Sequence, residues 1–94
     1  MNKKDLITKL KDKVFEITKA EGFLTYIYTD TIYKYCISVF SEQIVFNVFK
    51  IEKGLIRKRL KPLESFELTP KEFNEIMYIT FNDFTFNLLY HYKK

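Results

Sequence analysis

Apolar residues near the start of the chain recur three or four positions apart, a spacing that places side chains on one face of an α-helix. This pattern predicts a single amphipathic helix over residues 3–21. Its apolar face would be formed by Leu6, Ile7, Leu10, Val14 and Ile17. Gly22 stands where the C-terminal cap is expected, because glycine adopts the left-handed conformation that commonly ends a helix.

The pattern then changes to alternation with a period of two, and β-branched and aromatic residues become frequent, as is typical of strands. The predicted strands are Phe23 to Thr29, Ile32 to Phe40, Ile44 to Ile51 and Leu55 to Lys61. We expect Pro62 to end the fourth strand, because proline has no N–H group to donate to a strand ladder. The stretch from Leu63 to Leu68 would then connect this strand to the next element.

Four tyrosines alternate along the first two predicted strands. They are Tyr26, Tyr28, Tyr33 and Tyr35. A two-residue loop at positions 30 and 31 would place Tyr28 opposite Tyr33 and Tyr26 opposite Tyr35, so that all four share one face. That face could lie open and stack nucleic-acid bases, or it could pack under the helices. Ile37 continues the same face, which favours packing.

A helix start follows the strands. Thr69 is the expected N-cap, Pro70 the first helical residue and Glu72 the partner in a capping box. The helix either continues toward the C-terminus or breaks near Asn82-Asp83. One apolar stripe of this segment consists of Phe73, Ile76, Met77, Phe81, Phe84, Leu88 and Tyr92. The second stripe is a candidate protein interface, for a partner or a homodimer, unless the connector buries it. It consists of Tyr78, Ile79, Phe86, Leu89 and Tyr90.

Together these elements predict an α+β fold in the order α-β-β-β-(β)-α. The antiparallel meander sheet would pack against an N-terminal and a C-terminal helix. The 94 residues correspond to a single domain, 1–94, and ten Phe and seven Tyr supply enough apolar surface for a core.

Positive charge is concentrated in one stretch, Lys50 to Lys61, which we call the basic segment. It contains six cations and one acid, Glu52, and therefore carries +5, whereas the whole chain carries +4 and the remainder −1. The cations are Lys50, Lys53, Arg57, Lys58, Arg59 and Lys61. A patch this localised favours an anionic partner, either a phosphate backbone or an acidic protein surface.

Alternate residues of a strand point the same way, so Arg57, Arg59 and Lys61 would form a row of cations able to follow a phosphate backbone. Arginine also makes bidentate contacts that lysine cannot make. The alternative interpretation is a solvated edge strand whose charge prevents aggregation.

The sequence gives little support for an enzymatic function. His91 is the only histidine and has no nucleophile or carboxylate at a supporting spacing. The single cysteine, Cys36, falls in a predicted strand and can form neither an internal disulfide nor a metal framework. With only Gly22 and Gly54, there is no glycine-rich phosphate loop. The sequence therefore predicts a protein that is not an enzyme and has no cofactor, metal site or small-molecule substrate.

The stretch from Phe66 to Phe73 resembles the strand-to-helix junction of small dimeric single-stranded-DNA-binding transcription coactivators. The shared part is largely a helix-capping sequence that many unrelated proteins use, so it assigns no family. Size and composition are similar to those of phage proteins that inhibit host defence, including anti-CRISPR proteins. Abundant Lys, Ile, Asn, Phe and Tyr are typical of AT-rich coding sequence, such as that of phages and mobile elements.

Two functions follow as expectations. The first is a small DNA-binding or RNA-binding protein whose basic segment contacts phosphate. The alternative is an anti-CRISPR-like inhibitor or adaptor that binds and blocks a nucleic-acid-handling host protein. The lone cysteine and the absence of a long apolar run favour a cytoplasmic protein with no membrane partner.

Overall fold

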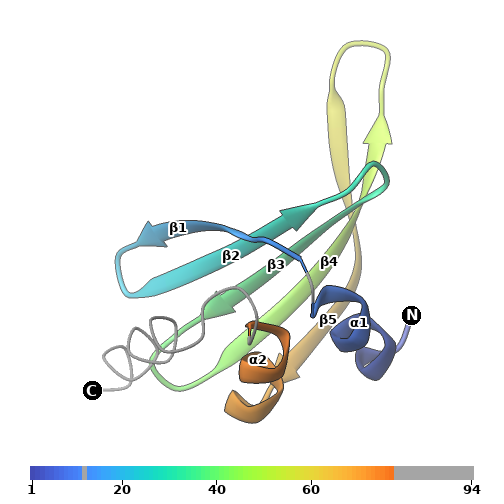
Figure 1. Cartoon of the computed structure of the whole chain (residues 1–94). Helices are drawn as coiled ribbons and strands as arrows, with labels where there is room; N and C mark the ends of the chain where they lie inside the picture. Colours follow the sequence, from blue (N-terminus) through green and yellow to red (C-terminus); the bar gives the residue numbers. More distant parts are fainter. Residues whose placement is uncertain (12, 78–94) are drawn as a thin grey trace.

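A computed structural model describes residues 1–11 and 13–77. The elements, in chain order, are α1 (Lys3–Leu10), β1 (Glu16–Ala20), β2 (Phe23–Thr29), β3 (Tyr33–Val39), β4 (Ile44–Lys53), β5 (Lys58–Leu68) and α2 (Pro70–Met77). The five strands form one antiparallel sheet in the order β1-β2-β3-β4-β5. The α+β class and the meander are confirmed, with one strand more than the sequence predicted (Figure 1).

Alternate residues of the strands bury one face of the sheet under both helices. Leu6, Ile7 and Leu10 of α1 share a single apolar cluster with Phe73, Ile76 and Met77 of α2. The strands contribute the other large buried side chains of this cluster. They are Leu24, Tyr26, Tyr35, Ile37, Val39, Ile44, Phe46, Val48 and Leu68. The core thus lies between the helices and one face of strands β2 to β5.

The predicted helix over residues 3–21 is wrong beyond Leu10. Residues 16–20 instead form β1, which pairs with β2 through Ile17 opposite Tyr26. The core receives Phe15 rather than Val14, which is 78% exposed. The backbone of β2 would otherwise be an unpaired edge, so hairpin pairing with β2 overrides a helical pattern in which Ile17 and Thr18 already favour a strand.

Gly22 does not cap a helix. It lies in the two-residue loop between β1 and β2, where Ala20 pairs with Phe23. Its φ of 87° is in the left-handed region, which glycine adopts at no steric cost and which tight hairpin loops require. The left-handed backbone conformation predicted for Gly22 is thus correct, but it belongs to a hairpin loop and not to the end of a helix.

The hairpin between β2 and β3 has a longer loop than predicted. Tyr28 pairs with Tyr35, and Tyr26 with Ile37, so the register differs by two residues. Because the side-chain period of a strand is two, this shift leaves all four tyrosines on the predicted face. Tyr26 and Tyr35 are buried, and Tyr28 and Tyr33 pack partly buried against the core, so the packed interpretation holds and base stacking on an open face does not.

β5 runs through Pro62, contrary to prediction. The predicted connector from Leu63 to Leu68 is the inner half of this strand, and Phe66 pairs with Phe46. β5 is an edge strand, and a register shift between Val48 and Phe49 lies opposite Pro62. Edges and bulges are the two places in a sheet where a missing N–H group costs little.

The start of α2 confirms the predicted capping box. Thr69 Oγ1 accepts a hydrogen bond from the Glu72 amide at 3.1 Å, and Glu72 Oε1 accepts one from the Thr69 amide at 2.9 Å. Glu72 also forms an ion pair of 3.1 Å with Lys3 of α1, which ties the two helices together. Residues 78–94 lie outside the described part of the chain, and with them Asn82-Asp83 and the predicted interface stripe of Tyr78, Ile79, Phe86, Leu89 and Tyr90.

The loop between β2 and β3 is organised by Asp30. Its Oδ1 accepts hydrogen bonds from the Ile32 and Tyr33 amides at 2.8 and 2.6 Å. Its Oδ2 lies 3.6 Å from Lys9 Nζ and accepts a bond of 3.4 Å from the Tyr35 hydroxyl. Lys9 in turn donates to that hydroxyl at 2.7 Å. One carboxylate therefore shapes the loop and attaches α1 to it.

These contacts shift the pKa values of the cluster. Partial burial acts to raise the pKa of Asp30, but the two amide donors and the Lys9 ammonium outweigh it and hold this pKa below its ordinary value. The hydrogen bond to Tyr35, together with the Asp30 charge, raises the pKa of Lys9. Burial raises the pKa of Tyr35, so the phenol keeps its proton at neutral pH.

The position at which α1 ends can be tested by two alanine substitutions. Leu10→Ala removes a fully buried side chain and should lower the free energy of unfolding by about 2–5 kcal/mol. Val14→Ala should change it by less than about 0.5 kcal/mol, because Val14 is exposed. Urea denaturation of both variants measures this difference. A continuous helix over residues 3–21 would make the two losses comparable.

The Asp30 cluster predicts a specific acid dependence of stability. A carboxylate with a depressed folded-state pKa contributes stability above its unfolded pKa of about 3.9, and this contribution disappears as the pH falls through the folded value. Asp30→Asn keeps an oxygen acceptor but removes the charge. It should cost on the order of 1 kcal/mol at pH 7 and lose less stability than the wild type below about pH 4.

The measurement is urea denaturation between pH 7 and pH 2.5. Glu16→Gln is the matched control, because the Glu16 carboxylate makes no ion pair or hydrogen bond within residues 1–11 and 13–77. An Asp30→Asn curve parallel to that of the wild type would contradict the role assigned to this carboxylate.

Candidate functional site

The basic segment forms an arm that extends beyond the rest of the sheet. β3 ends its pairing with β4 at Tyr33 opposite Lys50, whereas β4 and β5 continue to pair as far as Lys53 opposite Lys58. Figure 1 shows this two-stranded part projecting past the other strands. At about 3.3 Å per residue, the ribbon extends about 10 Å past Lys50 before the loop begins.

The base of the arm is held by the backbone of the β2–β3 loop. The Ile51 amide donates a hydrogen bond of 2.7 Å to the Ile32 carbonyl, one residue past the last pair between β3 and β4. The Ile32 amide is itself bound by Asp30. The Asp30 cluster therefore fixes the point at which the arm leaves the body of the protein.

The cations of the basic segment surround the arm. Lys50 is paired with Lys61 and Glu52 with Arg59, and these four side chains lie on the face that continues the core side of the sheet. The other face carries Lys53 opposite Lys58. Arg57 belongs to the loop that closes the arm. Each face of the ribbon thus has a net positive charge, and the loop adds one more.

The predicted cation row is therefore only partly correct. Arg59 and Lys61 share one face, as expected, but Arg57 is not on the strand, because β5 begins at Lys58. Lys50 takes its place beside Lys61. All six cations of the basic segment are exposed, and within the described residues none of them takes part in an ion pair.

The electrostatics of the arm favour an external anion. Lys50 faces Lys61 and Lys53 faces Lys58 at cross-strand distance, and like charges in such positions repel. Only Glu52 provides an opposite charge within the arm. Phosphates placed along either face would relieve this repulsion and gain charge-assisted hydrogen bonds.

Sequence reasoning missed the residues at the tip of the arm. Leu55 and Ile56 were assigned to a strand, but they lie in the loop between β4 and β5 and are the two most exposed large apolar residues of the described chain. The signal that could have found them is their position directly after Lys53-Gly54 and before Arg57, since apolar side chains inside a charged turn have no core to enter.

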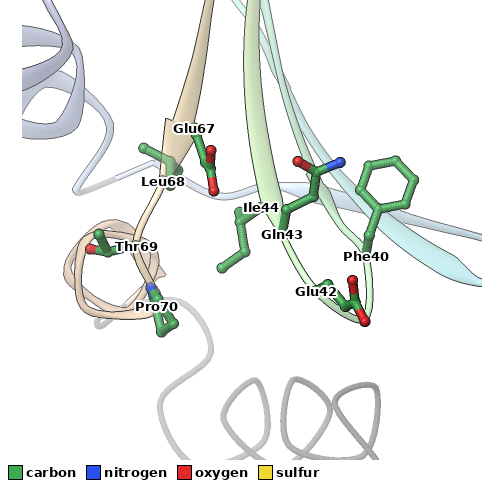
Figure 2. A pocket seen from close by; sticks show the side chains of 8 residues that line it. All are labelled: Phe40, Glu42, Gln43, Ile44, Glu67, Leu68, Thr69 and Pro70. Carbon is green, nitrogen blue, oxygen red and sulfur yellow. The ribbon is translucent and has the colours of Figure 1, made fainter.

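A cleft lies at the opposite end of β4 and β5. Its volume is about 390 Å³, and its lining residues are Phe40, Glu42, Gln43, Ile44, Glu67, Leu68, Thr69 and Pro70. Figure 2 shows the side chains of the β3–β4 loop on one side of this cleft and the start of α2 on the other. The described residues that line the cleft include two glutamates and no lysine or arginine, so this lining does not suit a phosphate.

The remaining sequence candidates are placed as follows. Cys36 lies half-buried on β3, where burial raises the pKa of the thiol although Lys34 acts in the opposite direction. The thiol is thus protonated at neutral pH and is a poor nucleophile. His91 lies outside the described residues. Among those described, no helix is long and apolar enough to cross a membrane.

Comparisons of the chain with protein-family models, with curated proteins and with solved structures find no match.

Proposed function

We propose that this protein binds nucleic acid through the arm formed by its basic segment. The observation that carries the proposal is the arrangement of six exposed cations on both faces and the loop of a projecting two-stranded ribbon. A cationic surface that lies flat would suit any acidic partner. A narrow ribbon that is cationic all round suits a groove lined by phosphates on both sides.

The dimensions support this proposal. Two strands lie about 4.8 Å apart, and a two-stranded ribbon of this width can enter a duplex groove, including a minor groove that is widened when the DNA bends. The short rows Lys50–Glu52 and Arg59–Lys61 would face one phosphate wall, and Lys53 and Lys58 the other. Lysines at these positions attract phosphate at long range, and Arg57 and Arg59 can form bidentate contacts once docked.

The acidic cleft supports the same orientation. Glu42 and Glu67 lie at the far end of β4 and β5 from the tip of the arm, so a polyanion is repelled there and attracted at the arm. This asymmetry along the long dimension of the molecule would steer the arm toward the phosphate backbone during encounter.

Replacement of both arginines tests the proposed function. Arg57→Ala/Arg59→Ala should weaken binding to a 25-base-pair duplex by on the order of tenfold or more at low salt, and reduce the salt-dependence slope by about 2. Both residues are exposed, so the melting temperature should remain nearly unchanged. Fluorescence anisotropy with labelled duplex DNA, single-stranded DNA and duplex RNA, over a salt titration, gives both quantities.

The matched control is Lys4→Ala/Lys71→Ala, which removes the same charge from α1 and α2, where neither lysine makes an ion pair within the described residues. It should leave affinity within about twofold if the arm is the site and not the net charge. Wild-type protein that binds none of the three nucleic acids at 50 mM salt would sink the proposal and leave the protein-binding inhibitor as the function to pursue.

A further inference from the structure

The outermost part of the arm is apolar. Leu55 and Ile56 are 107% and 97% exposed, whereas the next most exposed large apolar residue of the described chain, Val14, is at 78%. They are adjacent in the loop, with Lys53 and Gly54 before them and Arg57 and Lys58 after them. Two branched apolar side chains held in water at the end of a cationic ribbon contribute nothing to the core described above.

The loop is closed in a way that keeps these two residues at its apex. The Gly54 amide donates a hydrogen bond of 3.0 Å to the Arg57 carbonyl, so the chain turns back over four residues. A Cβ atom at Gly54 would lie 2.7 Å from the same carbonyl oxygen, closer than real Cβ contacts come. Glycine is therefore required for the tight closure that leaves only Leu55 and Ile56 between the two closing residues.

We propose that on duplex DNA this tip acts as a wedge: Leu55 and Ile56 enter the minor groove and insert between neighbouring base pairs, unstacking them and bending the duplex. The inference rests on the proposed nucleic-acid binding and specifies how the same arm engages its ligand. Apolar side chains inserted from the minor groove are a general means of kinking DNA, and flexible pyrimidine–purine steps yield most easily.

The distribution of charge behind the tip agrees with a groove. Arg57 and the Lys53–Lys58 pair are next to the apolar residues and would contact the phosphates nearest the opened step. Lys50 and Lys61 lie about 10 Å farther back along the ribbon, where only a partner that extends along the arm can reach them. If the tip entered a flat lipid surface, this second pair of cations would remain outside the headgroup layer. Duplex DNA can therefore contact more of the cations of the arm than a membrane can.

The test separates binding from unstacking. The ligand is a 25-base-pair duplex with 2-aminopurine beside a central TA step and a dye at each end, so that base unstacking and bending are read together with affinity. Wild-type protein should raise 2-aminopurine fluorescence by about twofold and increase energy transfer between the ends. Leu55→Ser/Ile56→Ser keeps all six cations and should retain affinity within about threefold but lose most of both signals.

Val14→Ser/Ile17→Ser is the control, since it changes two exposed apolar residues away from the arm and its base and should behave as the wild type. Tip-variant signals equal to those of the wild type would overturn the wedge, as would wild-type binding to the duplex without any signal. The same proteins are also tested for binding to vesicles that contain phosphatidylserine. Tip-dependent vesicle binding without DNA unstacking would also overturn the wedge, in favour of a membrane anchor.

The two proposals fail in distinguishable ways. A wild-type protein that binds single-stranded or duplex nucleic acid with a steep salt dependence but does not unstack the duplex leaves the proposed function intact and removes the wedge. A wild-type protein with no affinity for nucleic acid removes both.

Discussion

The pairing of β4 with β5 is the interaction on which the rest of the structure depends. This one ladder extends from Ile44 opposite Leu68 in the core to Lys53 opposite Lys58 in solvent. Its inner half is bound on the other side by β3 and is covered by both helices, so hydrophobic burial and strand pairing support each other there. Within residues 1–11 and 13–77 its outer half has no third strand and no helix beside it. It is stable only as an extension of the inner half, because an isolated two-stranded ribbon is at best marginally stable in water.

That division explains how one strand pair combines a buried core with an exposed, positively charged ribbon. Phe46 and Val48 are fully buried, and only two residues further along the same face Lys50 is exposed. Core packing dictates apolar residues in the first part and places no such demand on the second, where charge can accumulate. The register shift beside Pro62 marks the boundary between the two parts. Bulges bend a strand and increase the local twist of a strand pair, so we expect the arm to be twisted relative to the buried part of the sheet.

The sequence was sufficient for features that depend on local chemistry. The α+β class, the strand Phe23–Thr29 and the capping box at Thr69 follow from alternation, β-branched composition and side-chain capping, which act over a few residues. The misassigned parts depend on pairing with a neighbouring strand, which the pattern within the segment itself does not reveal. β1 exists because β2 offers it an edge, and β5 passes Pro62 because Phe66 and Leu68 pair with the core strand β4. The charge of the basic segment can be read from the sequence. How its cations are arranged around the arm depends on the register between β4 and β5, and the apolar tip can be recognised only once the ends of the loop between these strands are known.

The repulsion within the arm links its stability to its ligand. Lys50 faces Lys61 and Lys53 faces Lys58, so the outer ladder is weaker than backbone pairing alone would make it. Anything that binds the paired arm and not the separated strands stabilises it by mass action. A polyanion meets this condition, because only the closed ribbon gathers six cations within reach of neighbouring phosphates. The Asp30 loop, which holds Ile32 against Ile51 at the base, supplies the fixed point from which such ordering would spread outward. The arm is therefore a segment whose own charges oppose its folded form, and a ligand of opposite charge offsets that opposition.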